Sequence, residues 1–281
     1  MNASRTDHNL VGGQGIASGF RDAISAAWRL AIACRPGFEQ HEKLFEAWYG
    51  ERQQQLEKSL IATINNGNLC TDSSIVKTTL RDWYLWFYQL VPSWRHQLEL
   101  GPRQKGLIRY KWETGFPFLA IRNGGRTFPQ VFCSPYYSSP KQPLFTDDII
   151  FRKNKTALFQ LVVLIDSPDE MGAAKADLAH LKEMGEGELK VDEATYLVQD
   201  HVLLNTEEGP VDFDLKYAFQ IIESGTSDPD IWAGLPSPQG YDGSKLAKEV
   251  EGRYIIVRPD RELLEASDAL DAMISRPEIN F

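Results

Sequence analysis

An apolar, β-branched run at residues 157–165 limits the fold of this chain more than any other stretch. Its length and composition are typical of a strand that is buried on both faces in the centre of a sheet. A helix is predicted from Asp169 to about Met184, and a second strand is predicted near Thr195 to Val202. Strand, helix and strand in this order predict a right-handed β-α-β crossover between parallel strands.

A second strand pattern closes the chain. Residues 252–261 read as a strand that ends in the turn Pro259-Asp260, with an antiparallel partner strand at residues 262–266. Ser267 and Asp268 are alternative N-caps for a final helix through Ile274.

The first hundred residues are mostly helical in pattern. After a glycine-rich start, apolar residues recur at helical spacing through residue 31, and Pro36-Gly37 ends that helix. A second helix is predicted from His41 to Asn66, before a turn at residues 65–68, and a third from N-caps at residues 71–74 through Val91. Its aromatic block has two interpretations, core packing or a cage for an aromatic substrate, and we favour the core; the block comprises Trp83, Tyr84, Trp86, Phe87 and Tyr88.

The middle of the chain has weaker signals. Residues 100–103 read as a linker, followed by strand candidates at residues 107–110 and 116–121. Turns are predicted at residues 123–125 and at Ser134-Pro135.

The glycine-rich start, Gly12-Gly13-Gln14-Gly15, is the one stretch that indicates chemistry. A loop that enters a helix leaves unpaired backbone N–H groups at the helix end, where the peptide dipoles add partial positive charge. Such a position favours an anionic or electron-rich ligand edge, and glycine lets a flat ligand approach the backbone.

Residues 12–31 resemble the last flavin-contacting motif of the FAD-dependent aromatic hydroxylases of the para-hydroxybenzoate and phenol hydroxylase type. The resemblance implies that Gly13, Gln14 and Gly15 form the loop, and that the amides of Ile16 and Ala17 contact flavin O2 and N1. The family usually has Asn where Ala17 stands, but the contact uses the backbone. Asp22 is implied to be a structural hydrogen-bonding residue of the helix.

Three further segments resemble the same family. Residues 48–52 are similar to a Tyr-x-x-Glu-Arg segment of the family, so Glu51 and Arg52 are implied to be structural. Residues 125–130 are similar to the Gly-x-Arg-x-Pro-Gln opening of the family's C-terminal domain. Residues 252–261 resemble the Val-Arg-Pro-Asp turn of that thioredoxin-like domain. The implied fold is α+β or α/β. A helical remnant of an FAD-binding domain, residues 1–100, precedes a thioredoxin-like domain, residues 101–281.

The family resemblance implies an FAD-dependent monooxygenase that uses NAD(P)H and hydroxylates a small aromatic substrate. However, no Gly-x-Gly-x-x-Gly fingerprint follows a predicted strand, and Asp7 and His8 do not fall at the spacing of the family's ribityl-binding Asp. We therefore expect a C-terminal part that is inactive alone and holds no catalytic residue. The alternative is a non-catalytic thioredoxin-like interaction or dimerisation module, with a homodimer as the assembly.

Cysteine usage excludes dithiol chemistry. Asp166-Ser167-Pro168-Asp169 stands where a working thioredoxin has Cys-x-x-Cys. Cys34, Cys70 and Cys133 are far apart and form no metal-ligand spacing with the histidines, so we expect buried or half-buried thiols and no metal.

Composition excludes two classes of partner. A net charge of −9 without any basic run argues against nucleic acid, and the apolar runs are too short to span a membrane. The first residues lack a signal-peptide pattern, so a cytoplasmic location is expected.

Overall fold

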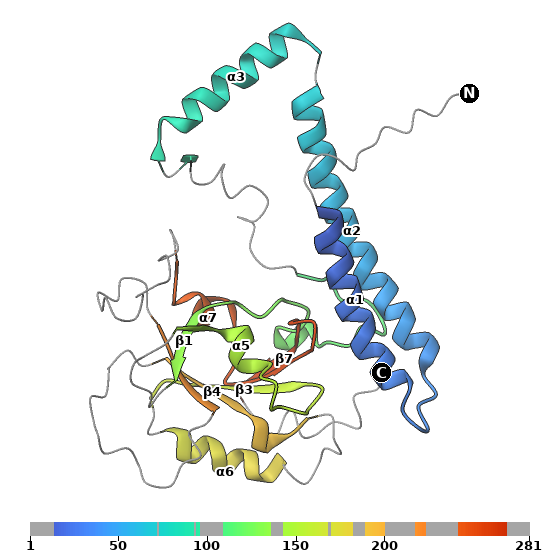
Figure 1. Ribbon diagram of the computed structural model, residues 1–281, viewed down its shortest axis with the longest axis vertical. Coiled ribbons are helices and arrows are strands. Elements are labelled where there is room, and N and C mark those ends of the chain that lie inside the picture. The colour runs from blue at the N-terminus through green and yellow to red at the C-terminus, as the bar shows by residue number, and fades with distance from the viewer. Residues whose placement is uncertain are drawn as a thin grey trace.

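The computed structural model describes residues 14–71, 73–92, 94–95, 109–135, 143–167, 170–181, 189–199, 217–222 and 241–268. Within them, a mixed seven-stranded sheet carries helices on both faces, and a pair of long helices stands at its side (Figure 1). In chain order the elements are α1 (Gln14–Ala33), α2 (His41–Thr71), α3 (Ile75–Gln89), η3 (Ala120–Arg122), β1 (Phe132–Pro135), β2 (Leu144–Phe145), α5 (Thr146–Ile150), β3 (Gln160–Ile165), α6 (Met171–Leu181), η5 (Val191–Glu193), β4 (Thr195–Val198), β5 (Ala218–Ile221), α7 (Lys245–Glu249), β6 (Tyr254–Val257) and β7 (Leu263–Ser267).

The sheet has the order β2-β1-β5-β4-β3-β6-β7. β3 pairs in parallel with β4, with Val162 opposite Thr195, and antiparallel with β6, with Val162 also opposite Ile255. All six residues of β3 are buried. The predicted central strand and the parallel strand-helix-strand unit are therefore confirmed, although β3 begins at Gln160 and β4 ends at Val198.

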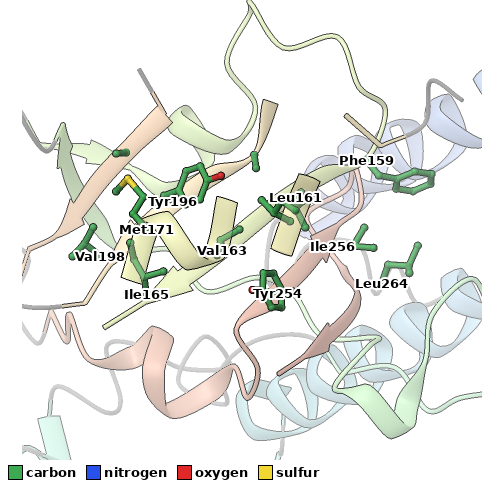
Figure 2. Close-up of a cluster of buried hydrophobic side chains, with 14 of the residues drawn as sticks. Phe159, Leu161, Val163, Ile165, Met171, Tyr196, Val198, Tyr254, Ile256 and Leu264 are labelled. Carbon is green, nitrogen blue, oxygen red and sulfur yellow. The ribbon is translucent and has the colours of Figure 1, made fainter. Parts of the chain in front are cut away.

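Alternate residues of β3 enter two different cores. Leu161 and Val163 belong to one core with Met171 of α6 (Figure 2). Trp28 of α1 is part of the same core. Val162 and Leu164 point to the other face, where α5 and α7 cover the sheet. The first core also includes Ile32 and Leu44, so residues before and after position 100 share it.

The β6–β7 hairpin matches its prediction. β7 pairs antiparallel with β6, and the chain turns at Pro259 and Asp260. Arg261 takes a left-handed φ of 70° in this turn. The final helix predicted through Ile274 lies outside the described residues, as does the linker predicted at residues 100–103.

Three local predictions are wrong. Residues 65–68 continue α2 instead of forming a turn; a single glycine in a helix costs only about 1 kcal/mol, so Gly67 does not end it. Residues 116–121 form no strand, because Phe116 and Phe118 turn inward against Ala47 of α2. Ser134-Pro135 belongs to β1, where it pairs with β5.

The predicted turn at residues 123–125 is confirmed. Asn123 and Gly125 both have left-handed φ values, 58° and 76°. Between them, a Cβ on Gly124 would lie 2.4 Å from the carbonyl oxygen of Leu264, so only glycine fits this approach to β7.

Candidate functional site

The residues of the flavin-like motif lie at the start of α1. Gln14 and Gly15 are predicted to lie in the entry loop, but α1 already begins at Gln14, so both residues are helical. A difference of one or two residues at a helix end is common. Ile16 and Ala17 belong to the first turn of α1. The amide of Ile16 has no acceptor within the helix, whereas Ala17, as the fourth helical residue, is at the first position whose amide donates within it. Gly13 lies outside the described residues.

The described residues offer a flavin one edge and no cradle. Ile16 is 76% exposed and Phe20 is 67% exposed, and a Cβ on Gly19 would meet no heavy atom of the described chain within 4 Å. A tricyclic isoalloxazine needs walls on its faces as well as donors at its edge. The residues described around this helix start therefore do not fit the cofactor by themselves.

A continuous row on α1 shows where the helix leaves the body of the protein. Ile16, Phe20, Ile24 and Trp28 follow one another at four-residue steps, and their exposed fractions fall from 76% through 67% and 48% to 2%. The second half of α1 packs on the sheet, whereas the first half extends past it (Figure 1).

The long helix α2 follows the same course. Leu44, Ala47 and Glu51 near its start are buried. Further along the helix the exposed large apolar side chains are Leu56, Leu60, Ile61 and Ile64. The apolar face predicted for this helix is thus buried only in its first half. We call residues 14–24, 56–71 and 75–89 the arm.

The helix α3 completes the arm and buries none of its residues. Val76, Leu80, Trp83 and Phe87 follow helical spacing and form the middle of an apolar face, and all four are exposed. The prediction that this aromatic block belongs to a core is wrong. Its periodicity is that of a packed helix, but none of the described layers covers it.

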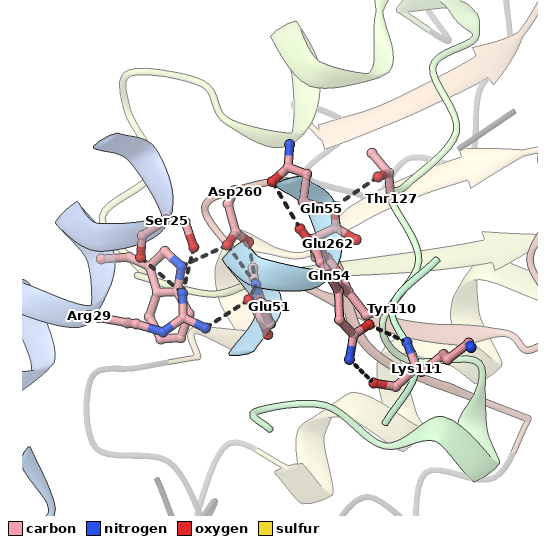
Figure 3. A network of polar contacts seen from close by, with 12 residues as sticks. Ser25, Arg29, Glu51, Gln54, Gln55, Tyr110, Lys111, Thr127, Asp260 and Glu262 are labelled. Carbon is pink, nitrogen blue, oxygen red and sulfur yellow. Dashed lines mark hydrogen bonds and ion pairs between the residues drawn. The ribbon is translucent and has the colours of Figure 1, made fainter. Parts of the chain in front are cut away.

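A buried ionic network anchors the arm to the sheet (Figure 3). Arg258, in the β6–β7 hairpin, donates from Nη1 and Nη2 to the two oxygens of Glu51 at 2.7 and 2.9 Å. Arg29 of α1 donates to Glu51 Oε2 at 2.8 Å. Asp260 accepts from Arg258 Nη2 at 2.6 Å and from Trp28 Nε1 at 2.9 Å. One carboxylate of α2 therefore ties α1 to the sheet.

The network combines two guanidinium groups with two carboxylates, so its formal charges cancel. Burial lowers the pKa of Arg29, and attraction to Glu51 offsets only part of this. Burial also acts against the charge on Arg258, but attraction to Asp260 and Glu51 outweighs it and raises the pKa of Arg258. For Asp260, attraction to Arg258 similarly outweighs burial and lowers the pKa. Mutual pairing thus keeps these hairpin charges ionised in a buried place.

The structural roles predicted for three residues are confirmed. Glu51 is in the network, and Arg52 forms an ion pair with Asp22 of α1. Sequence reasoning did not predict the roles of Arg29 and Arg258. Nothing in the sequence indicates that two arginines 229 positions apart bind the same carboxylate, that of Glu51. The signal that could have indicated them is a carboxylate on the buried side of a helix, since a buried charge requires partners.

The thiols differ from one another. Cys133 is buried in β1, where burial raises the pKa of its thiol. Cys34 is exposed just after α1, so the prediction of a buried or half-buried thiol is wrong there.

No protein-family model matches this chain, and the comparison with curated proteins finds no match. Among the helices that the structure describes, none combines the length and the apolar character needed to cross a membrane.

Glu262, next to the network, makes stability depend on pH. It accepts a hydrogen bond from Thr127 at 2.8 Å, while its second oxygen has no partner among the described residues. Burial, with repulsion from Asp260, raises the pKa of Glu262 to about 8. The folded state then holds a proton that the unfolded state loses near pH 4.5, so this group lowers stability as pH rises from about 4.5 to about 8.

We expect Glu262→Gln to remove that loss. Relative to wild type, the variant should gain roughly a few kcal/mol in free energy of unfolding between pH 5 and pH 9, measured by urea unfolding. Glu57→Gln, an exposed change on α2, is the control and should leave the pH profile unchanged. Parallel profiles for wild type and Glu262→Gln would contradict the assignment.

Proposed function

We propose that this protein is a non-catalytic assembly module in which a thioredoxin-like sheet domain displays the arm, and two copies pair through it. The observation that carries the proposal is α3: a helix with an apolar face and no buried residue. Contiguous exposed apolar surface of this kind marks interaction sites in soluble proteins.

The outer parts of α1 and α2 extend this surface. Ile16, Phe20 and Ile24 on α1, and Leu60 and Ile61 on α2, are exposed beyond the sheet. Each of these helices is held at its other end by the buried network, so the arm is anchored at one end and uncovered at the other.

A second copy is the occupant that this surface favours. A two-fold interface needs only one self-complementary patch, and two-fold dimers are the commonest oligomers. The middle row of α3, Val76, Leu80, Trp83 and Phe87, contains no charge that would be buried without a partner when two such faces meet.

The topology supports a thioredoxin-like interpretation of the sheet domain. β3, α6 and β4 form a parallel unit, and the antiparallel β6–β7 hairpin adds to the other side of β3. Asp166 and Ser167 follow β3, at the point where a redox-active member has its first thiol. Without that thiol the domain would act in assembly, not in disulfide exchange.

Charge placed on the apolar face of α3 should separate the copies. We expect the wild type to have the mass of a dimer by size-exclusion chromatography with light scattering, and Leu80→Glu and Trp83→Glu to have the mass of a monomer. Because α3 buries no residue, both variants should keep the thermal unfolding profile of the sheet domain.

Gln89→Glu is the matched control. It adds the same charge to the same helix on its polar face, near Asp82, and should remain a dimer. A wild type with monomer mass over the whole accessible concentration range would overturn the proposed pairing.

A second candidate function comes from the family resemblance: the flavin-bearing part of an aromatic hydroxylase, with NAD(P)H as electron donor and an aromatic substrate. The start of α1 favours it, because a helix N-terminus offers backbone donors to an electron-rich ligand edge, and Ile16 in its first turn is 76% exposed. The walls of the FAD site around Gly13–Ala17 would have to come from outside the described residues. Titration of the purified chain with FAD tests this: saturable binding with a perturbed flavin spectrum would support flavoprotein activity, and its absence would leave assembly alone.

A further inference from the structure

A second uncovered face runs along the outer half of α2. Leu56, Leu60, Ile64 and Gly67 follow one another at steps of four, four and three residues, so they lie in one row along the helix. The three large side chains are exposed. Apart from its own helix backbone, a Cβ on Gly67 would meet no heavy atom of the described chain within 4 Å. These four residues, which we call the α2 row, therefore form an open apolar strip with a depression at Gly67.

The apolar face of α3 has a similar length. Its middle residues, Val76, Leu80, Trp83 and Phe87, are exposed along a helix of 15 residues, which is about 22 Å long. We call these four residues the α3 row. The outer half of α2, residues 56–71, is about as long, so one row can lie along the other.

A short connection sets the register between the two rows. Only residues 72–74 separate α2 from α3, and connections of about two to five residues join antiparallel helices that pack on each other. Antiparallel packing about this connection places Leu80 opposite Gly67, and Phe87 opposite Leu60. The side chain of Leu80 then meets the depression in the α2 row.

In the structure, α3 is open about this connection and does not cover the α2 row of its own chain. It runs away from α2 (Figure 1), and none of its residues is buried. Ser74, which directly precedes α3, has an extended backbone with φ −74° and ψ 116°. An element that stands open beside its own complementary face makes the same contacts with a second copy at low cost, which is the route to a dimer by exchange of an element.

Buried area decides which surface of a second copy covers α3. A fully covered aromatic side chain buries about 150–250 Å², so a half-exposed large side chain still offers roughly 100 Å². Two α3 rows that meet each other would bury roughly 800 Å², which is the size of a nonspecific contact. Each α3 row on the α2 row of the other copy would bury roughly 1,400 Å², which is in the range of stable dimers.

We propose that the two copies exchange α3, so that the α3 row of each copy packs antiparallel on the α2 row of the other, with residues 72–74 as the hinge. This inference rests on the proposed pairing of copies and assigns the surfaces that meet. Neither row contains Asp, Glu, Lys or Arg, so the exchange buries no charged side chain of either row. Gly67 is the position that discriminates between the two arrangements, because only the exchanged one places a side chain over it.

Gly67→Leu tests the exchange with opposite expected effects on one copy and on two. Leucine is the better helix former and meets no obstacle in a single copy, so α2 should not be weakened. Under the exchanged α3 it overfills the interface, and the dimer dissociation constant from analytical ultracentrifugation should rise at least about tenfold. A Cβ on Gly172 of α6 also meets no heavy atom within 4 Å, so Gly172→Leu is the matched control and should dimerise as wild type does.

A disulfide between chains tests the register. In chains with Cys34→Ser and Cys70→Ser, we expect a Leu60→Cys chain mixed with a Phe87→Cys chain to form an interchain disulfide under mild oxidation. A dimer that lacks this disulfide and tolerates Gly67→Leu would overturn the exchange and leave the proposed pairing of copies intact. A wild type that is monomeric at every concentration would overturn both.

Discussion

Replacing Glu51 by alanine is expected to lower the free energy of unfolding by about 3–5 kcal/mol, because the change leaves buried guanidinium groups without their shared carboxylate. Arg258 is fully buried and makes two of its hydrogen bonds to Glu51, and Arg29, also fully buried, makes one. Asp260 alone cannot balance both positive charges. The loss of stability should therefore exceed the loss that would come only from the space left by the shortened side chain.

Urea unfolding of the Glu51→Ala variant measures this effect, with Glu57→Ala as the control. Glu57 lies on the same helix and is exposed, so its removal should change stability by less than about 0.5 kcal/mol. Glu51→Gln keeps the size of the side chain and removes the charge, and we expect it to be nearly as destabilising as alanine. If Glu51→Gln were as stable as wild type, the network would not depend on ionic pairing.

Replacing Trp28 alone by alanine is expected to lower the free energy of unfolding by about 3–5 kcal/mol, because a large side chain is removed from a packed core. Trp28 is 2% exposed, packs edge-on against Phe159 with ring centres 5.8 Å apart, and donates to Asp260. It is also where the apolar row of α1 passes from solvent into the core. Its loss should therefore weaken the attachment of the arm as well as the sheet domain.

The chain provides a matched comparison for Trp28→Ala. Trp86 on α3 is 58% exposed, so Trp86→Ala should leave the stability of the sheet domain close to that of wild type. Trp28→Phe retains most of the apolar volume and removes the hydrogen bond to Asp260, so an intermediate loss is expected. Equal losses for Trp28→Ala and Trp86→Ala would contradict the division between anchor and arm.

Local patterns were sufficient to predict the centre of the sheet. The run at residues 157–165 is apolar because both faces of β3 are covered, and the Pro259-Asp260 pair marks a hairpin through the chemistry of the turn itself. The turn depends on residues that are neighbours in the sequence, and the composition of β3 depends on the burial that any central strand of a covered sheet has.

The arm could not be predicted in the same way. Trp83 and Phe87 have the spacing of core residues, and only the placement of the other layers leaves them exposed. Periodicity shows that a helix has an apolar face but does not identify what covers that face. The anchor was also beyond sequence reasoning, because Glu51 and Arg258 meet only when the hairpin is folded against α2.

The flavin-like motif shows a further limit of local patterns. The sequence around Gly15 predicts a helix start with donors, and α1 has one. A binding site also needs walls from elsewhere in the fold. The exposure of Ile16 and Phe20 indicates that the described residues do not form such walls, which the motif alone does not show.

Hydrogen exchange at the backbone amides of α3, measured over a range of protein concentrations, tests the proposed pairing most directly. A 15-residue helix that buries none of its side chains should exchange rapidly by itself, so protection that rises with concentration would come from a second copy. We predict that protection of α3 increases with concentration in step with dimer formation and is lost in Leu80→Glu. Rapid exchange of α3 at every concentration, in wild type and Leu80→Glu alike, would contradict the role of the arm as an assembly surface.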